Sequence, residues 1–181
     1  MMVLKGKNIL LTGIPGIGKT TVIEKVVSQL GGEDLVSGFY TSEIREGGSR
    51  LGFKIKTIDG KEGTLSHIRI KAATRVGRYG VDVRKFEELV LPLLNGNLKL
   101  KKLVVIDEIG KMECFSDKFK EAVMRALDSP IFVLGTIALK GGGFISEVKS
   151  RPDVTIIQVT EKNRDALPEQ LVSTILRTLA A

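Results

Sequence analysis

The sequence predicts an α/β fold in which a mostly parallel sheet is flanked by helices. Short apolar runs alternate with stretches whose apolar residues recur at helical spacing, and glycine-rich turns separate them. The apolar runs lack a polar alternation, which is typical of strands buried on both faces of a parallel sheet. The chain has 181 residues, 43% of them hydrophobic and 27% charged, so we expect one globular domain spanning residues 1–181.

The first half of the chain is predicted to contain a strand, a helix and a group of antiparallel strands. Residues 7–12 form an apolar run that ends in a glycine-rich turn, and residues 20–30 carry apolar side chains at helical spacing. Residues 39–46 and 50–58 flank a Glu-Gly-Gly-Ser turn, and a further strand is predicted at 63–70. We interpret these last three strands as an antiparallel β-meander added to the parallel sheet.

The second half alternates helices and strands. Buried strands are predicted at 103–106, 131–136 and 154–159, and helices at 83–94, 117–127, 144–149 and 168–179. Asp82 and Ser116 precede two of these helices and are residue types that cap helix N-termini. This alternation predicts that the sheet grows by parallel crossover connections.

Composition narrows the class of protein and its location. The apolar runs are too short to cross a bilayer, the N-terminus lacks the pattern of a signal peptide, and Cys114 has no second cysteine with which to form a disulfide. These features predict a cytoplasmic protein without a membrane partner. The net charge of +7 raises a nucleic-acid partner as an alternative, which the scattered positive charges and scarce aromatic residues disfavour.

A complete phosphate-binding motif follows the first strand. Residues 13–20 read GIPGIGKT and fit the pattern G-x-x-x-x-G-K-[ST] in full. Glycines let the backbone curl so that its N–H groups surround the phosphates, and the following helix points its N-terminus at them. We expect Lys19 to reach the β- and γ-phosphates and the Thr20 hydroxyl to bind Mg²⁺.

Two adjacent carboxylates end the strand at 103–106. Asp107 takes the position of the strand-end aspartate that holds magnesium in phosphate-loop enzymes, and Glu108 is predicted to align or deprotonate the attacking water. The neighbouring strand ends at Thr136, which we predict to sense the γ-phosphate, with an ordinary strand-end threonine as the alternative. Such an Asp-Glu pair resembles the Walker B element of RecA-like and AAA+ ATPases.

Other polar residues have weaker claims to the site. Arg75, Arg78 and Arg84 form a basic cluster, in which Arg78 between two glycines is the candidate arginine finger and a solvated loop is the alternative. Asn163 and Arg164 follow the last strand, where the base of a nucleotide is expected in an open α/β sheet.

Several segments together resemble one family, the thermophilic-type P-loop nucleoside-triphosphatases, also called cancer-related nucleoside-triphosphatases. They are GIPGIGKTT, GFYTSEIREGG, RVGRYGVDV, VVIDEIGKMEC and VLGTIA, between about residues 8 and 168. The resemblance implies a RecA-like core and Mg²⁺-dependent hydrolysis of ATP, GTP and other triphosphates with little base preference. It also implies nucleotide contacts in residues 13–20 and 103–110. Together with Thr21 and the two residues after the last strand, the predicted nucleotide-binding residues are Gly13, Ile14, Pro15, Gly16, Ile17, Gly18, Lys19, Thr20, Thr21, Leu103, Val104, Val105, Ile106, Asp107, Glu108, Ile109, Gly110, Asn163 and Arg164.

The leading functional prediction is therefore a nucleoside-triphosphatase. One alternative is a nucleotide or nucleoside kinase, because kinases have similar phosphate loops and the segment 70–84 carries three arginines. Another is a nucleic-acid-regulated switch that uses slow hydrolysis as a timer, which the net charge of +7 suggests. Glu108 beside the magnesium aspartate favours water over another phosphoryl acceptor.

Overall fold

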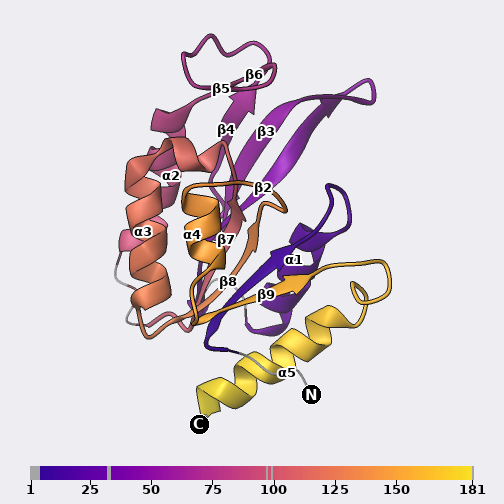
Figure 1. The fold of residues 1–181 in the computed structure, drawn as a ribbon, viewed down its shortest axis with the longest axis vertical. Coiled ribbons are helices and arrows are strands. Elements are labelled where there is room, and N and C mark those ends of the chain that lie inside the picture. The colour runs from indigo at the N-terminus through magenta and orange to yellow at the C-terminus, as the bar shows by residue number, and fades with distance from the viewer. Residues whose placement is uncertain (1–4, 32–33, 97, 99, 181) are drawn as a thin grey trace.

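The computed structural model describes residues 5–31, 34–96, 98 and 100–180, which form a sheet covered by helices on both faces (Figure 1). The strands are β1 (Asn8–Thr12), β2 (Val36–Glu46), β3 (Ser49–Thr57), β4 (Glu62–His67), β5 (Arg75–Val76), β6 (Tyr79–Val81), β7 (Leu103–Ile109), β8 (Phe132–Ile137) and β9 (Val154–Gln158). The helices are α1 (Lys19–Gln29), α2 (Val83–Asn95), α3 (Asp117–Asp128), α4 (Phe144–Lys149) and α5 (Leu167–Ala180), with a short 3₁₀ helix, η2, at Glu113–Phe115.

The strands join in one sheet with the order β5-β6-β4-β3-β2-β7-β8-β1-β9. The first part of β2 pairs in parallel with β7, and the pairs β7–β8, β8–β1 and β1–β9 are parallel as well. In this part of the sheet, β8 lies between β1 and β7. The strand before the phosphate-binding motif, β1, is therefore separated from the acidic strand, β7, by β8, the strand that ends near Thr136. The predicted α/β class, with parallel strands flanked by helices, is confirmed.

The predicted β-meander is present and belongs to the same sheet. The second part of β2 pairs antiparallel with β3, and β3 pairs antiparallel with β4. The extension ends with β6 and β5, which the sequence did not reveal because strands of two or three residues are too short to show a period. Figure 1 shows the β2–β3 hairpin projecting beyond the parallel strands.

Alternate side chains of the central strands enter cores on opposite faces of the sheet. In β7, Leu103 and Val105 pack under α1 and α5, whereas Val104 and Ile106 pack under α2, α3 and α4. In the second core, the rings of Phe39, Phe86 and Phe119 meet edge to face with centroids 5.0–6.1 Å apart. These strands read as continuous apolar runs because both of their faces are buried.

Both predicted helix caps are present. The Asp82 carboxylate accepts a hydrogen bond from the Lys85 N–H at 2.9 Å, and the Ser116 hydroxyl accepts one from the Phe119 N–H at 3.0 Å. None of the helices in the described part of the chain is long and apolar enough to span a membrane.

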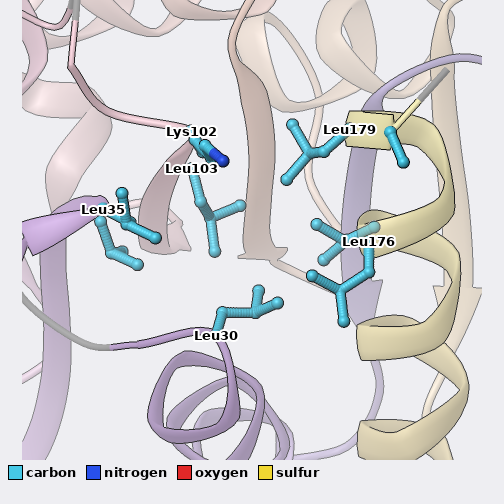
Figure 2. A pocket seen from close by; sticks show the side chains of 9 residues that line it. Leu30, Leu35, Lys102, Leu103, Leu176 and Leu179 are labelled. Atoms are coloured by element: carbon cyan, nitrogen blue, oxygen red, sulfur yellow. The ribbon is translucent and has the colours of Figure 1, made fainter.

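An apolar cavity of about 340 Å³ lies at the amino ends of β2 and β7. Figure 2 shows leucine side chains from β7, α5, the C-cap of α1 and the segment before β2 around this space. The labelled leucines are Leu30, Leu35, Leu103, Leu176 and Leu179. This cavity lies at the opposite end of β7 from Asp107, so it is separate from the polar cleft described next.

Candidate functional site

The phosphate-binding motif forms a tight loop between β1 and α1. Gly16 and Gly18 have φ angles of 78° and 105°, values that side chains with a Cβ disfavour, which explains glycine at both positions. The Lys19 ammonium group bends back over the loop and donates to the carbonyls of Gly13 at 3.1 Å and Ile14 at 3.3 Å. The first turn of α1 leaves N–H groups at the loop, as an anion site requires.

Asp107 joins the phosphate loop to the neighbouring strand. Its carboxylate accepts hydrogen bonds from the Thr20 hydroxyl at 2.6 Å and from the Thr136 hydroxyl at 2.5 Å. The side chain is 2% exposed, and burial raises its pKa to about 6, although the two threonine hydroxyls favour the charged form. The predicted residues from three separate elements thus meet at one carboxylate.

The register of β7 against β8 shifts between Ile106 and Ile109, where Asp107 and Glu108 lie. Such irregularities re-aim side chains at the ends of strands. Glu108 lines the same cleft as Lys19. Burial raises the pKa of Glu108, and the Lys19 charge opposes that shift. A partly desolvated carboxylate of this kind suits a general base.

These residues form one side of a cleft of about 780 Å³. We call the phosphate loop with Asp107 and Glu108 the inner wall. The outer wall consists of the cleft-lining residues of β2 and β3, which are Thr41, Ser42, Glu43, Arg45, Arg50 and Phe53. Sequence reasoning missed the outer wall; the only signal was the run of polar and charged residues flanking the predicted hairpin turn.

The structure places several predicted residues away from the cleft. The side chains of Leu103, Val104, Val105 and Ile106 are buried in the two cores, so Asp107 and Glu108 are the part of this segment that lines the cleft. Arg78 does not line it; its Nη2 donates to the carbonyl of Arg50 at 2.6 Å.

The turn after β9 lies beside the phosphate loop. A Cβ built on Gly18 would be 3.9 Å from Cδ of Arg164, so this arginine runs alongside the loop. Asn163 shapes the turn, because it accepts from the Thr160 N–H at 2.8 Å and donates to the Gln158 carbonyl at 2.9 Å. Contact of either residue with a nucleotide base stays a prediction.

Sequence reasoning also missed a buried acid behind the cleft. Glu113, in η2, is 5% exposed, and burial followed by the nearby charge of Glu108 raises its pKa to about 8. A Cβ built on Gly110 would lie 2.8 Å from a carboxylate oxygen of both Glu108 and Glu113, so the two acids flank this glycine. An isolated glutamate after a strand has no sequence pattern that distinguishes burial from exposure.

Comparisons with known proteins agree with this geometry. A family model described as NTPase matches residues 8–172. The nucleoside-triphosphatase THEP1 of Thermotoga petrophila is 44% identical over 164 residues, covering 91% of this chain and 90% of the relative. The human cancer-related nucleoside-triphosphatase is 40% identical over 183 residues, covering 93% of this chain and 96% of the relative.

Two solved structures share the fold. The crystal structure of THEP1 from Aquifex aeolicus gives a TM-score of 0.84 at 36% identity and covers 93% of this chain and 98% of that one. The solution structure of the human cancer-related protein gives 0.78 at 39% identity, with 93% and 96% covered. With the phosphate loop, the strand-end acids and nearly full-length matches in agreement, this chain belongs to the NTPase family.

Proposed function

We propose that this protein hydrolyses nucleoside triphosphates to nucleoside diphosphates and inorganic phosphate. The observation that carries the proposal is the 2.6 Å hydrogen bond between Thr20 of the phosphate loop and Asp107 of β7. It joins the anion cradle and the acidic strand end around one cleft, which is what the binding of a polyphosphate tail requires. The curated relatives named nucleoside-triphosphatases support the same reaction.

We further propose that Mg²⁺ binds at Thr20 and Asp107. The hydroxyl and the carboxylate already lie within hydrogen-bond distance, and both are oxygen ligands of the kind Mg²⁺ prefers. Among the described residues, no group of three or more His, Cys, Asp or Glu side chains is placed to hold a metal. Mg²⁺ is usually bound by one or two protein groups together with substrate phosphates and water. When bound, the ion neutralises charge on the phosphates.

The roles of the protein side chains follow from their positions. Water attacks the γ-phosphorus, the bond to the bridging β–γ oxygen breaks, and Glu108 accepts the proton of the water. Lys19, with the N–H groups of the loop, stabilises the charge that develops on the phosphoryl oxygens. Thr136 donates a 2.5 Å hydrogen bond to Asp107, so we assign it the role of positioning this carboxylate. Its role as a sensor of the γ-phosphate stays a prediction.

A turnover panel tests this function. Release of inorganic phosphate is measured for the common ribo- and deoxyribonucleoside triphosphates, with Mg²⁺ and with a chelator. We expect hydrolysis of all of them with little base preference, because the inner wall contacts phosphates, and we expect the chelator to abolish it. Absence of phosphate release with every triphosphate would overturn the proposal.

The kinase alternative is tested in the same assay by adding nucleosides or nucleoside monophosphates. A kinase transfers the γ-phosphoryl group to an acceptor and excludes water. Diphosphate formation that depends on the acceptor, with negligible phosphate release, would favour a kinase. We expect phosphate release that does not depend on an acceptor.

The nucleic-acid-regulated switch is tested with polynucleotide at low salt. If the net charge of +7 served nucleic-acid binding, turnover would rise and the effect would fade steeply as salt increased. We expect no change in turnover.

A cytoplasmic location, which the lone cysteine favours, is a further part of the proposed function.

A further inference from the structure

Arg50, at the beginning of β3, is held in one orientation on the outer wall. Its Nε donates to the Tyr79 hydroxyl at 3.1 Å, and its Nη1 donates to the Glu43 carboxylate at 2.8 Å. The guanidinium carbon lies 5.1 Å from the ring centroid of Phe53 and 5.7 Å from that of Tyr79. Two hydrogen bonds and two rings therefore restrict a side chain that is ordinarily flexible.

The backbone of Arg50 is restrained as well. Arg78 donates from Nη2 to the Arg50 carbonyl at 2.6 Å, and its guanidinium carbon lies 5.3 Å from the ring centroid of Tyr79. The arginine predicted from sequence as a finger thus supports a second arginine, and that second arginine lines the cleft.

Part of the hydrogen-bonding capacity of Arg50 is unused. A guanidinium group has five N–H donors, and within the described part of the chain only Nε and Nη1 of Arg50 donate to protein atoms. The side chain is 37% exposed and lines the same cleft as Lys19 and Glu108. Nη2 and one N–H of Nη1 therefore remain available to a ligand in the cleft.

The neighbouring Arg45 also lines the cleft and pairs with Glu43, but it is more exposed than Arg50 and, among the described residues, is not held by aromatic rings. Its side chain is 56% exposed, its Nε donates to Glu43 at 2.6 Å, and its Nη1 donates to the Gly48 carbonyl in the hairpin turn at 3.0 Å. Within the described part of the chain, the Arg45 guanidinium makes no contact with an aromatic ring, whereas the Arg50 guanidinium contacts two. Two arginines against the single carboxylate of Glu43 leave one positive charge on this wall.

We propose that Arg50 binds a phosphoryl group in the cleft from the side opposite the phosphate loop. A planar guanidinium presents paired N–H groups that match phosphoryl oxygens, and restraint before binding lowers the entropy cost of the contact. The phosphoryl group has two sources, the terminal group of a bound triphosphate or the released inorganic phosphate. This inference rests on the proposed function, since it assigns a residue to the same cleft.

The test compares Arg50→Gln with Arg125→Gln. Arg125 is a matched control because it lies in the last turn of α3, where it bonds the Asn95 side chain, and it does not line the cleft. Thermal unfolding establishes that both variants fold. Turnover, KM, the affinities for a non-hydrolysable triphosphate and for a diphosphate, and inhibition by inorganic phosphate are then measured.

For Arg50→Gln we expect kcat to fall about 10²-fold, with diphosphate affinity unchanged. Weaker binding of the triphosphate analogue identifies the terminal phosphoryl group as the ligand. Weaker inhibition by inorganic phosphate alone, by about 10-fold, identifies the released product. Parent values of kcat, analogue affinity and phosphate inhibition in Arg50→Gln would overturn the inference, as would equal losses in Arg125→Gln.

Two further arms keep the test decisive. If Arg50→Gln fails to fold, Arg50→Lys replaces it, because lysine keeps the charge but loses the paired donors, and the same measurements are read. If the parent protein releases no phosphate, the proposed function fails by itself. The role of Arg50 is then decided by whether Arg50→Lys and Arg50→Gln lower the preference for the triphosphate analogue over the diphosphate.

Discussion

The inner and outer walls of the cleft hold their functional side chains by different means. On the inner wall, Asp107 is 2% exposed and is fixed by hydroxyl groups from two other elements, α1 and β8. On the outer wall, Glu43, Arg45 and Arg50 are each about a third or more exposed and hold one another by ion pairs. Exposed ion pairs contribute little to stability. We therefore expect changes on the inner wall to lower activity at least as much as the loss of Arg50 on the outer wall.

The largest expected effect comes from Lys19→Ala. The ammonium group already lies over the loop, so its loss removes charge stabilisation from both the bound triphosphate and the transition state. We expect kcat/KM to fall by about 10³-fold, with triphosphate affinity weakened as well. Steady-state phosphate release and equilibrium binding measure the two effects. A variant with parent affinity and turnover would contradict the role of the inner wall.

Glu108→Gln separates chemistry from binding on the same wall. The amide keeps the shape of the side chain but cannot accept the proton of the attacking water. We expect triphosphate affinity to stay nearly intact while kcat falls by about 10²-fold or more. Exposed Glu121 supplies a control, Glu121→Gln, which should behave as the parent does. Hydrolysis at the parent rate in Glu108→Gln would show that another group acts as the base.

A pair of glycine variants compares the stability of the two regions. A Cβ on Gly38 would lie 2.0 Å from the Val105 carbonyl oxygen, where β2 meets β7, whereas a Cβ on Gly48 in the hairpin turn meets nothing within 4 Å. We expect Gly38→Ala to lower the free energy of unfolding by about 3 kcal/mol or more. Gly48→Ala should cost about 1 kcal/mol, because its φ of 79° disfavours alanine. Urea titrations of both variants give the comparison, and equal losses would contradict it.

A change in the pH dependence of stability, rather than in activity, is expected at Glu113, behind the inner wall. Burial raises its folded pKa from 4.5 to about 8, so the folded state keeps a proton that the unfolded state has lost. Stability from this group is complete below pH 4.5 and declines as pH rises to about 8, with a slope of up to about 1.4 kcal/mol per pH unit.

Glu113→Gln removes this titration, so its free energy of unfolding should decline less than that of the parent across the same range. Denaturation at several pH values measures the slopes. The exposed-site variant Glu121→Gln is again the control and should follow the parent. Identical slopes in Glu113→Gln and the parent would show that Glu113 titrates normally in the folded protein.

Local sequence patterns were sufficient to predict the parallel strands, the helix caps and the inner wall. The phosphate loop is contiguous, and Asp107 follows an apolar run, so strand order alone brings Thr20, Asp107 and Thr136 together. The sequence supplied the residues at the strand ends, and the order β7-β8-β1 in the sheet brings them together.

The outer wall could not be predicted in the same way. Its residues are exposed polar side chains of a hairpin, and their relevance depends on how far β2 continues past the end of β7 and how the sheet twists. The position of Arg78 could not be predicted for a related reason. Flanking glycines suggest mobility, but the contact with the Arg50 carbonyl arises only when β6 pairs with β4 beside β3.

The eleven-residue strand β2 connects the outer wall to the strand that carries Asp107 and Glu108. It pairs with β7 at Val36–Phe39 and with β3 from Phe39 to Glu46, so Phe39 takes part in both ladders. A shift of one residue at either end would move a fully buried phenyl ring out of its core. The position of the outer wall relative to Asp107 and Glu108 is thus fixed by one continuous backbone, that of β2.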